Sequence, residues 1–539
     1  MTTPYLQHIR TDQRADQTPQ SEPIPGSAQV ANSAGGYAWG LDDWQRLDRF
    51  LILGSEGGTY YATERRLTVE NAAALQRALV ADGPRVVARI VEISEAGRAP
   101  KNEPSVLALA IAASRGDAPT RRAACAALPA VCRTGTHLLH FVGYVKHLRG
   151  WGQGIKRAVA AWYQRDAREV AHQVLKYRQR DAWSQRDVLR LAHPTPPSGS
   201  HNAIYHWVTR GWPGVGSDPH PDASLVQIWA AEKAVAATDA GEVARLVREY
   251  RLPREAVPTN WLSDPKVWEA LLDDMPTTAL IRNLATLTRI GLVAHRSEAA
   301  RLVERRLANT EALRLARIHP VALLGALQVY SQGRGQRSSA TWTPVQSIVH
   351  ALDAAFYAAF GTVEPTGRRT MLALDVSGSM AGGRIAGVPG LTPRVGSVAM
   401  AMVTADREPS RELVAFSHEL VPFEFDGRAR LDDALRQVDA IPMGGTDCAA
   451  PIMYALDSRR QIDTFVVYTD SETWYGPIHP AQALARYRAE MGIAARLVVV
   501  GMVANEFTLA DPEDSGMLDV VGFDSATPDL IGQFSLGAL

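Results

Sequence analysis

The spacing of apolar residues changes once along this chain of 539 residues, near Pro365, and this change limits the possible folds more than any other feature. From Leu41 to about Phe360, apolar residues recur at helical spacing. After Pro365, short apolar runs alternate with helical stretches, as in 371-MLALD, 412-ELVAFS, 463-DTFVVYTD and 495-ARLVVVGMV. Buried parallel strands produce such continuous apolar runs, and the alternation is typical of βαβ units. We therefore predict a multidomain chain, in which an all-α region precedes a doubly wound α/β domain.

The helical region is predicted to consist of helix pairs. In 68-TVENAAALQRALVADGPRVVARIVEISEAG-97, one amphipathic stretch ends at Asp82-Gly83-Pro84 and a second begins directly after it. Similar pairs follow without a strict period, which HEAT-like repeats tolerate better than most repeat types. An ordinary large helical domain is the alternative, and the pattern alone does not exclude it. The expected bounds are 1–30 for a disordered polar tail, 31–365 for the helical module and 366–539 for the α/β domain.

The cysteines and the hydropathy indicate a reduced, cytoplasmic protein. Cys125, Cys132 and Cys448 are few, odd in number and without metal-finger spacing. Cys125 and Cys132 lie on one apolar helical face, where core packing is the simplest role. The N-terminus has no apolar signal-peptide core, and no apolar run is long enough to span a bilayer, so no membrane partner is expected.

The charge is balanced overall but divided along the chain. Lys and Arg together number 57, and Asp and Glu together number 57 as well. From Thr366 onward there are 14 Arg, no Lys and 23 acidic residues, a net charge of −9, which leaves +9 on the preceding part. Such asymmetry suggests that the basic part meets nucleic acid.

Short oxygen-bearing side chains follow three of the predicted strands. Because the carboxyl ends of parallel strands meet at one sheet edge, these side chains are expected to converge. Oxygen ligands with few carboxylates suit a small hard cation, Mg²⁺ or Mn²⁺. The alternative is ordinary turn and capping chemistry, which three matching loops make a weaker explanation. The candidate metal-site residues are Asp375, Ser377 and Ser379 in 371-MLALDVSGSM-380, Thr446 in 443-MGGTDC-448, and Asp470.

This pattern resembles the metal-ion-dependent adhesion site of von Willebrand factor A domains. The resemblance implies that Ser377, Ser379 and Thr446 contact the metal directly, whereas Asp375 and Asp470 act largely through water. Enzyme alternatives fit less well. An aspartyl-phosphate phosphatase needs a second carboxylate where Ser377 stands, a two-metal nuclease needs more carboxylates, and no nucleotide P-loop is present.

A basic segment with interleaved aromatic residues runs from Lys146 to Arg190. It holds 11 Lys and Arg against four Asp and Glu. Lys176 and Arg180 are four residues apart and are expected on one helical face. Ser184 and Asp187 form a predicted capping box that begins a new helix, on which Arg186, Arg190 and His193 share a face. Such basic faces are spaced for phosphates, although a solvated helical surface is an equally good interpretation, and the aromatic residues fit a core role better than base stacking.

Taken together, the chain resembles the Ro autoantigen family and its bacterial Ro-related members. The resemblance covers residues from about 30 onward and includes 33-SAGGYAWGLDDWQRLDRFLILGSEGGTYY-61, 176-KYRQRDAWSQRDVLRLAH-193 and 318-IHPVALLGALQVY-330. It implies a TROVE module, a ring of HEAT-like repeats, closed by the A domain. It further implies Y-RNA contacts at Lys176, Arg180 and His193, and a central hole that accepts single-stranded 3′ ends of misfolded RNA.

Two functional hypotheses remain open at this point. The first is a non-catalytic, monomeric RNA-binding protein of a ribonucleoprotein, which acts in RNA quality control, processing or decay with exoribonucleases, as the resemblance implies. The second is a metal-dependent adaptor whose A domain docks an acidic residue of a protein partner. Both can hold, because they concern different domains.

Overall fold

The computed structural model describes residues 17–539, apart from 56–62, 212–221, 317, 336–338, 361–363, 386–387, 389, 423–429, 525 and 539. The chain divides into two compact units, one formed by residues 1–74 with 356–539 and the other by residues 75–355. We call them the α/β unit and the helical unit. Among the described residues, no helix combines the length and apolarity that crossing a membrane requires.

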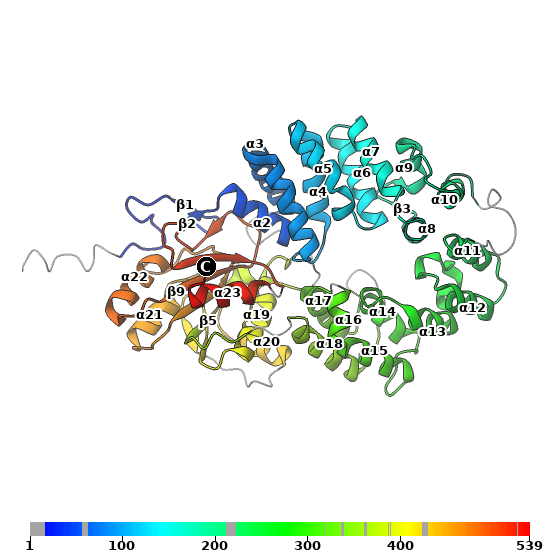
Figure 1. Cartoon of the computed structure of the whole chain (residues 1–539). Helices are drawn as coiled ribbons and strands as arrows, with labels where there is room; N and C mark the ends of the chain where they lie inside the picture. The colour runs from blue at the N-terminus through cyan, green and yellow to red at the C-terminus, as the bar shows by residue number, and fades with distance from the viewer. Residues whose placement is uncertain are drawn as a thin grey trace, which may run out of the picture. The chain divides into compact units, whose positions relative to one another are not determined.

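The α/β unit is built on a six-stranded sheet of order β11-β9-β8-β5-β6-β7, parallel except for β7 (Figure 1). The predicted strands are confirmed as β5 (Thr370–Asp375), β6 (Arg411–Phe416), β8 (Thr464–Thr469) and β9 (Arg496–Gly501). Every residue of β5 and β8 is buried, which explains their unbroken apolar runs. The remaining strands are the short β7 (Leu420–Pro422) and β11 (Met517–Val521) at the edges.

Helices cover both faces of this sheet, as in other doubly wound folds. On one face, Met371, Val414, Phe465 and Leu497 pack against apolar side chains of α21 and α22. On the other face, α19 contacts β5 and β8, and α23 contacts β11. The helices of this unit are α2 (Asp43–Leu53), α19 (Pro393–Arg407), α20 (Leu431–Asp439), α21 (Ala450–Asp457), α22 (Pro480–Met491) and α23 (Ala526–Leu536).

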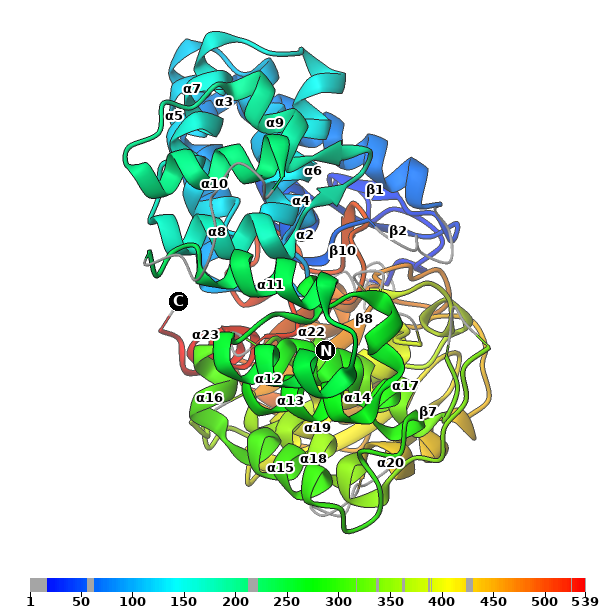
Figure 2. The same cartoon turned by 90° about the vertical axis from the view of Figure 1, so that its right-hand side faces the viewer.

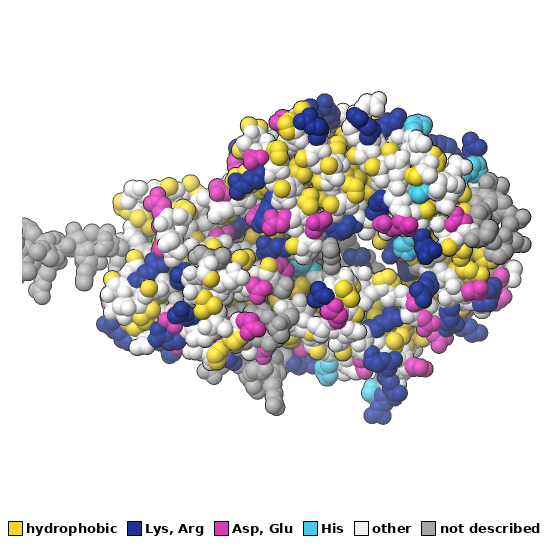
Figure 3. Space-filling view, viewed as in Figure 1, with side chains coloured by type: hydrophobic (Ala, Val, Ile, Leu, Met, Phe, Trp, Pro, Cys, Tyr) yellow, Lys and Arg dark blue, Asp and Glu magenta, His cyan; other side chains and the backbone are white. Residues whose placement is uncertain are grey.

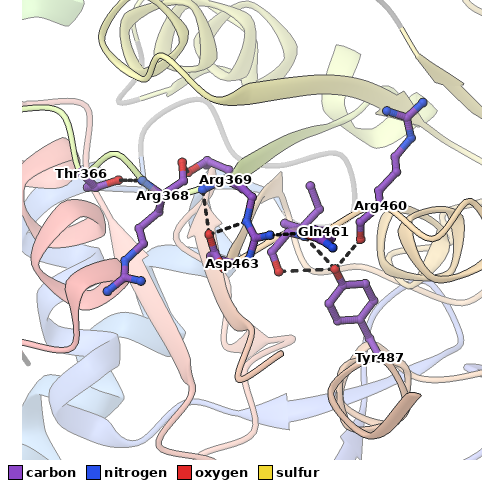
Figure 4. Close-up of polar contacts among 9 residues, drawn as sticks. Thr366, Arg368, Arg369, Arg460, Gln461, Asp463 and Tyr487 are labelled. Carbon is purple, nitrogen blue, oxygen red and sulfur yellow. Dashed lines mark hydrogen bonds and ion pairs between the residues drawn. The ribbon is translucent and has the colours of Figure 1, made fainter. Parts of the chain in front are cut away.

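An ion pair joins the starts of β5 and β8 at the amino edge of the sheet. Asp463 precedes β8 and accepts hydrogen bonds from the backbone N–H and the Nε–H of Arg369, at 3.0 and 2.9 Å (Figure 4). Arg369 lies just before β5, so the pair joins the starts of two neighbouring strands. Tyr487 of α22 adds a second link, because its hydroxyl donates to the carbonyl of Arg460 at 2.6 Å and accepts from the N–H of Ile462.

The N-terminal residues belong to the α/β unit, which differs from the predicted domain bounds. β1 (Gln29–Ala31) and β2 (Tyr37–Gly40) form a small antiparallel sheet with β10 (Phe507–Thr508). Arg49 of α2 is 1% exposed and pairs with Asp519 at 2.6 Å. Within the tail predicted over 1–30, Thr18 and Gln20 are buried in this unit, whereas residues 1–16 lie outside the described residues.

The helical unit consists of helices that pack on their neighbours, as expected for HEAT-like pairs (Figure 1, Figure 2). Its elements are α4 (Glu103–Arg115), α5 (Ala118–Val131), α6 (Gly135–Leu148), α7 (Gln153–Tyr163), α8 (Ala167–Lys176), β3 (Gln179–Arg180), β4 (Trp183–Ser184), α9 (Gln185–Ala192), α10 (Gly199–Arg210), α11 (Val226–Ala236), α12 (Ala240–Tyr250), α13 (Pro265–Asp274), α14 (Thr277–Arg289), α15 (Glu298–Ala308), α16 (Thr310–Leu315) and α17 (Pro320–Ser331). α3 (Glu64–Ala96) and α18 (Gln346–Ala358) cross the two boundaries between the units. The predicted break after the first amphipathic stretch is confirmed as a kink at Asp82, whose φ and ψ are −158° and 84°.

A hydrogen bond brings the two ends of the helical unit together. His319, which caps the N-terminus of α17, contacts the carbonyl oxygen of Arg98 through Nε2 at 3.1 Å. Its Nδ1 accepts from the N–H of Val321, so Nε2 carries the proton. Burial lowers the pKa of His319 to about 4, which keeps the ring neutral and this tautomer in place.

Candidate functional site

The basic segment forms a β-hairpin followed by a helix. α8 ends at Lys176, and Arg180 lies on β3, which pairs antiparallel with β4. Lys176 and Arg180 therefore do not share a helical face, and that prediction is wrong. The turn between the strands is made by Asp181 and Ala182, whose φ angles of 49° and 62° match a tight hairpin turn. Because alanine seldom adopts positive φ and no glycine is present, this turn is hard to predict from the sequence.

α9 begins where the sequence predicts. Ser184 is its N-cap, and the reciprocal hydrogen bonds with Asp187 complete the capping box. Val188, Leu189 and Ala192 are buried, whereas Arg186 and Arg190 on the other face are exposed. His193 is exposed too, but it lies beyond the helix as a left-handed C-cap with φ of 46°. α9 thus presents two arginines to solvent and ends in a histidine.

A buried glutamine that was not among the predicted site residues holds the hairpin in place. Gln185 is 2% exposed. Its Nε2 donates to the carbonyl of Tyr177 at 2.9 Å, its Oε1 accepts from the hydroxyl of Tyr163, and its backbone N–H donates to Arg178 at 3.0 Å. These bonds link α7, the end of α8 and the start of α9. A polar residue facing inward from a strongly amphipathic helix was the available signal.

The turn residue Asp181 makes a second attachment to the helical unit. Its carboxylate pairs with His140 of α6, a residue that is largely buried. Arg180 also approaches Asp181, at 4.0 Å, but the two side chains are more than half exposed, which makes the contact weak. The guanidinium of Arg180 therefore stays available to a ligand.

The aromatic residues of the segment divide between core and surface. Trp162 and Tyr163 are fully buried, and the indole N–H of Trp162 donates to the carbonyl of Cys132 at 2.6 Å. Lys176 lies 5.4 Å from the ring of Tyr177, which is half-buried. The core role expected for the aromatic residues is confirmed for the first two.

The predicted metal-site residues gather at the carboxyl end of the α/β sheet. Asp375 ends β5 and accepts from the N–H of Ser377 at 2.9 Å, and the hydroxyls of Ser377 and Ser379 are 3.1 Å apart. Ser379 in turn hydrogen-bonds to Asp470, which follows β8. The carbonyl oxygen of Thr446 accepts from Thr473, Trp474 and Tyr475, which joins its loop to the residues that follow Asp470.

The carboxylates of this site are buried, which disfavours their charged forms. Asp375 and Asp470 are at most 3% exposed. Burial raises the pKa of Asp375, and burial together with the nearby Asp375 and Glu472 raises the pKa of Asp470 to about 8. Within the described ranges, no three His, Cys, Asp or Glu side chains lie together in a way that could hold a metal. A cation at this edge would therefore depend on the three hydroxyls as well as the two carboxylates.

The N-terminal segment forms hydrogen bonds to these loops. The sequence did not indicate this arrangement. Gln20 is buried, and its Nε2 donates to Asp447 at 2.6 Å and to the carbonyl of Ile478 at 2.8 Å. Glu472 accepts from the N–H groups of Ser33 and Ala34 at 2.7 and 3.2 Å. The tail is rich in Gln and Thr, a composition typical of disordered segments. Its stabilising contacts come from loops of a sheet more than 400 positions away along the chain, so the local composition does not reveal them.

Comparison with known proteins gives matches over nearly the whole chain. A TROVE domain model matches residues 30–210 and 230–329, and a Ro60 vWA domain model matches residues 369–535. The RNA-binding protein RO60 of Deinococcus radiodurans is 42% identical over 96% of this chain and 97% of its own length. The protein of that name from Caenorhabditis elegans is 33% identical over 95% of this chain and 90% of its own length. The crystal structure of the Deinococcus radiodurans RO (RSR) protein superposes with a TM-score of 0.71 at 41% identity, covering 92% of this chain and 100% of that one.

Proposed function

Since this chain belongs to the Ro60 family of RNA-binding proteins, we propose that it is the non-catalytic RNA-binding component of a ribonucleoprotein. It binds a small noncoding, Y-like RNA through Lys176, Arg180 and His193, assisted by Arg186 and Arg190. It also binds single-stranded 3′ ends of misfolded or maturing RNA at a second site, and cooperates with exoribonucleases in RNA quality control, processing or decay.

One observation carries the assignment of the Y-RNA surface. Arg180, Arg186, Arg190 and His193 are all exposed, on a hairpin and helix that the buried Gln185 holds in place. Arginine side chains on a fixed scaffold bind phosphates with little loss of conformational entropy, and their planar forks match phosphate oxygens. No carboxylate within hydrogen-bonding distance neutralises Arg186 or Arg190 in the described part of the chain.

The salt dependence of binding tests this surface. A fluorescence anisotropy titration would measure the affinity of a labelled hairpin RNA at several salt concentrations. Each lost phosphate contact lowers the slope of log K against log salt by about 0.7–0.9. The variant Arg186→Ala/Arg190→Ala should therefore lower the slope by roughly 1.5, whereas the exposed pair Arg301→Ala/Arg305→Ala on α15 should not change it. Equal slopes for the two variants would contradict the assignment.

The donor set at the sheet edge fits a hard divalent cation, Mg²⁺ or Mn²⁺. Ser377, Ser379 and Thr446 would contact it directly, and Asp375 and Asp470 would act through water. Such a cation supplies an electrophilic position for an oxygen ligand. The chain's own residues hold the loops together: the hydroxyl of Thr469 donates to Asp375 at 2.6 Å, and Arg394 donates to the carbonyl of Val376 at 2.9 Å.

A second candidate function is a metal-dependent protein adaptor. It is favoured by exposed apolar side chains on the same loops, namely Met443, Trp474 and Tyr475, which are 59, 41 and 46% exposed. Apolar residues around a polar site are typical of a docking surface for an acidic residue with apolar neighbours. Binding of an acidic, leucine-rich peptide that requires Mg²⁺ and is lost in Trp474→Ser would support the adaptor. Binding without Mg²⁺ would contradict it.

A further inference from the structure

A pocket with four arginines lies in the helical unit, outside the hairpin and α9. Its volume is about 680 Å³, and its lining comes from α4, α5, the turn after α6, and the start of α7. The arginines are Arg121, Arg122, Arg149 and Arg157, and the remaining lining includes Cys125, Ile155 and several alanines, with no acidic residue. The volume lies within the range of small-molecule sites and exceeds that of a bare phosphate ion.

Hydrogen bonds to backbone carbonyls hold three of the four arginines in place. Arg121 donates to the carbonyl of Gly116 at 2.7 Å, Arg149 to that of Ser114 at 3.2 Å, and Arg157 to that of Gln153 at 3.4 Å. Arg122 is exposed beside them. Among the described residues, none of the four forms an ion pair. The carboxylate of Asp117 interacts electrostatically with Arg121 and Arg122 but forms no ion pair with them, and it caps α5 by accepting from the N–H of Thr120 at 2.9 Å.

The start of α7 adds backbone donors to the same wall. Gly152 is the N-cap and offers no side-chain hydrogen bond, so the first N–H groups of this eleven-residue helix have no capping partner from it. A Cβ built on Gly152 would meet nothing within 4 Å, which leaves the backbone open to a ligand. In Figure 3, Lys and Arg side chains gather along the upper edge of the molecule, over α5 and α7.

The pocket is suited to binding rather than to reaction. Burial raises the pKa of the Cys125 thiol despite the neighbouring Arg157 and Arg121, so the sulfur stays protonated and a poor nucleophile. Four guanidinium groups in a pocket that no carboxylate lines favour a dianion over a singly charged diester. The apolar wall of Ile155 and the alanines beside them would accommodate a flat, partly apolar group.

We propose that this pocket binds a nucleotide through its terminal phosphate monoester, with Arg122, Arg149 and Arg157 contacting the phosphate oxygens and the apolar wall contacting the base. The site is separate from residues 176–193, and it goes beyond the proposed function, which assigns no mononucleotide site. A free nucleotide and the phosphorylated end of an RNA share this chemistry.

Cys125 provides a built-in probe of occupancy. Cys132 and Cys448 are fully buried, so Cys125, which lines the pocket, is the thiol open to alkylation in the native chain. Labelling of the full chain by N-ethylmaleimide, followed by mass spectrometry, should slow by roughly tenfold with saturating AMP and stay unchanged with adenosine. In Arg122→Gln/Arg157→Gln the AMP concentration for half-protection should rise by about tenfold or more. The control pair Arg301→Gln/Arg305→Gln on α15 should behave as the wild type.

Two short RNAs distinguish a free nucleotide from an RNA end as the natural ligand. One carries a 5′-monophosphate and the other a 5′-hydroxyl group. Protection by the phosphorylated RNA at lower concentration than AMP assigns an RNA end, and the opposite order assigns a free nucleotide. Calorimetric titration with AMP provides the second measurement, and it decides the matter if Cys125 reacts too slowly to follow. Equal protection by AMP and adenosine, protection that survives in Arg122→Gln/Arg157→Gln, or no calorimetric binding at millimolar AMP would each overturn the proposal.

Discussion

Replacement of Gln185 by leucine tests whether the buried glutamine holds the basic hairpin. Leucine has a similar size but cannot hydrogen-bond, so Gln185→Leu leaves the Tyr163 hydroxyl and the Tyr177 carbonyl without their partner. Each buried group that loses its hydrogen bond costs about 1–3 kcal/mol, which gives roughly 2–6 kcal/mol for the pair. For a unit of this size the midpoint of thermal unfolding should fall by roughly 5–15 °C.

Thermal unfolding followed by far-ultraviolet circular dichroism measures the effect, and anisotropy with a labelled hairpin RNA measures its consequence. The matched control is Gln76→Leu, at an exposed position of α3, which should change stability by less than about 0.5 kcal/mol. Tyr163→Phe removes only one of the two contacts, so its effect should be smaller and should not add fully to that of Gln185→Leu. If Gln185→Leu unfolds and binds RNA as Gln76→Leu does, the network does not position the hairpin.

Three further predictions concern the α/β unit. Arg49→Ala should destabilise it by about 3–5 kcal/mol in calorimetric unfolding, because Asp519 would be left buried and unpaired; an unchanged transition would contradict the assignment of α2 to this unit. Hydrogen bonding to Arg369 lowers the pKa of Asp463, so the stability from this pair is present above the pKa of the unfolded side chain and is lost as the pH falls through the lower folded value. Asp463→Asn should therefore cost about 1 kcal/mol or less at neutral pH, and in acid titrations of unfolding the two proteins should converge once the pH lies below the folded pKa of Asp463, whereas a constant difference would refute the linkage. Mg²⁺ at about 100 times its Kd should raise the free energy of unfolding by about 2.7 kcal/mol in the wild type and not in Asp375→Asn/Ser377→Ala, and equal stabilisation of the variant would place the ion elsewhere.

The sequence predicted those features that depend on local patterns. β5 and β8 are buried on both faces, so their apolar runs are unbroken and their ends are clear. The capping box of Ser184 and Asp187 is a short-range motif, and α9 begins where it indicates. β11 was not predicted, because it is an edge strand with partly exposed residues in its middle and lacks a continuous apolar run.

Features that depend on distant partners could not be predicted in this way. Residues 17–36 take their order from loops near Thr473, which a composition rich in polar residues does not reveal. The turn at Asp181 and Ala182 requires positive φ angles at both residues, which is uncommon for alanine, and His140 stabilises it from another helix. Arg180 therefore lies on a strand although its spacing from Lys176 is helical.

A gel-shift titration of the variant Lys176→Ala/Arg180→Ala/His193→Ser tests the central claim most directly. Two labelled RNAs would be compared, a Y-like hairpin with a bulged stem and a structured RNA with a single-stranded 3′ tail. The control variant removes the same residue types from exposed positions of the helical unit, as Lys266→Ala/Arg301→Ala/His295→Ser. We predict that the first variant loses affinity for the hairpin by at least about tenfold and keeps the tailed RNA, while the control keeps both. Unchanged binding of both RNAs by the first variant would contradict the claim that this hairpin and helix form the Y-RNA surface.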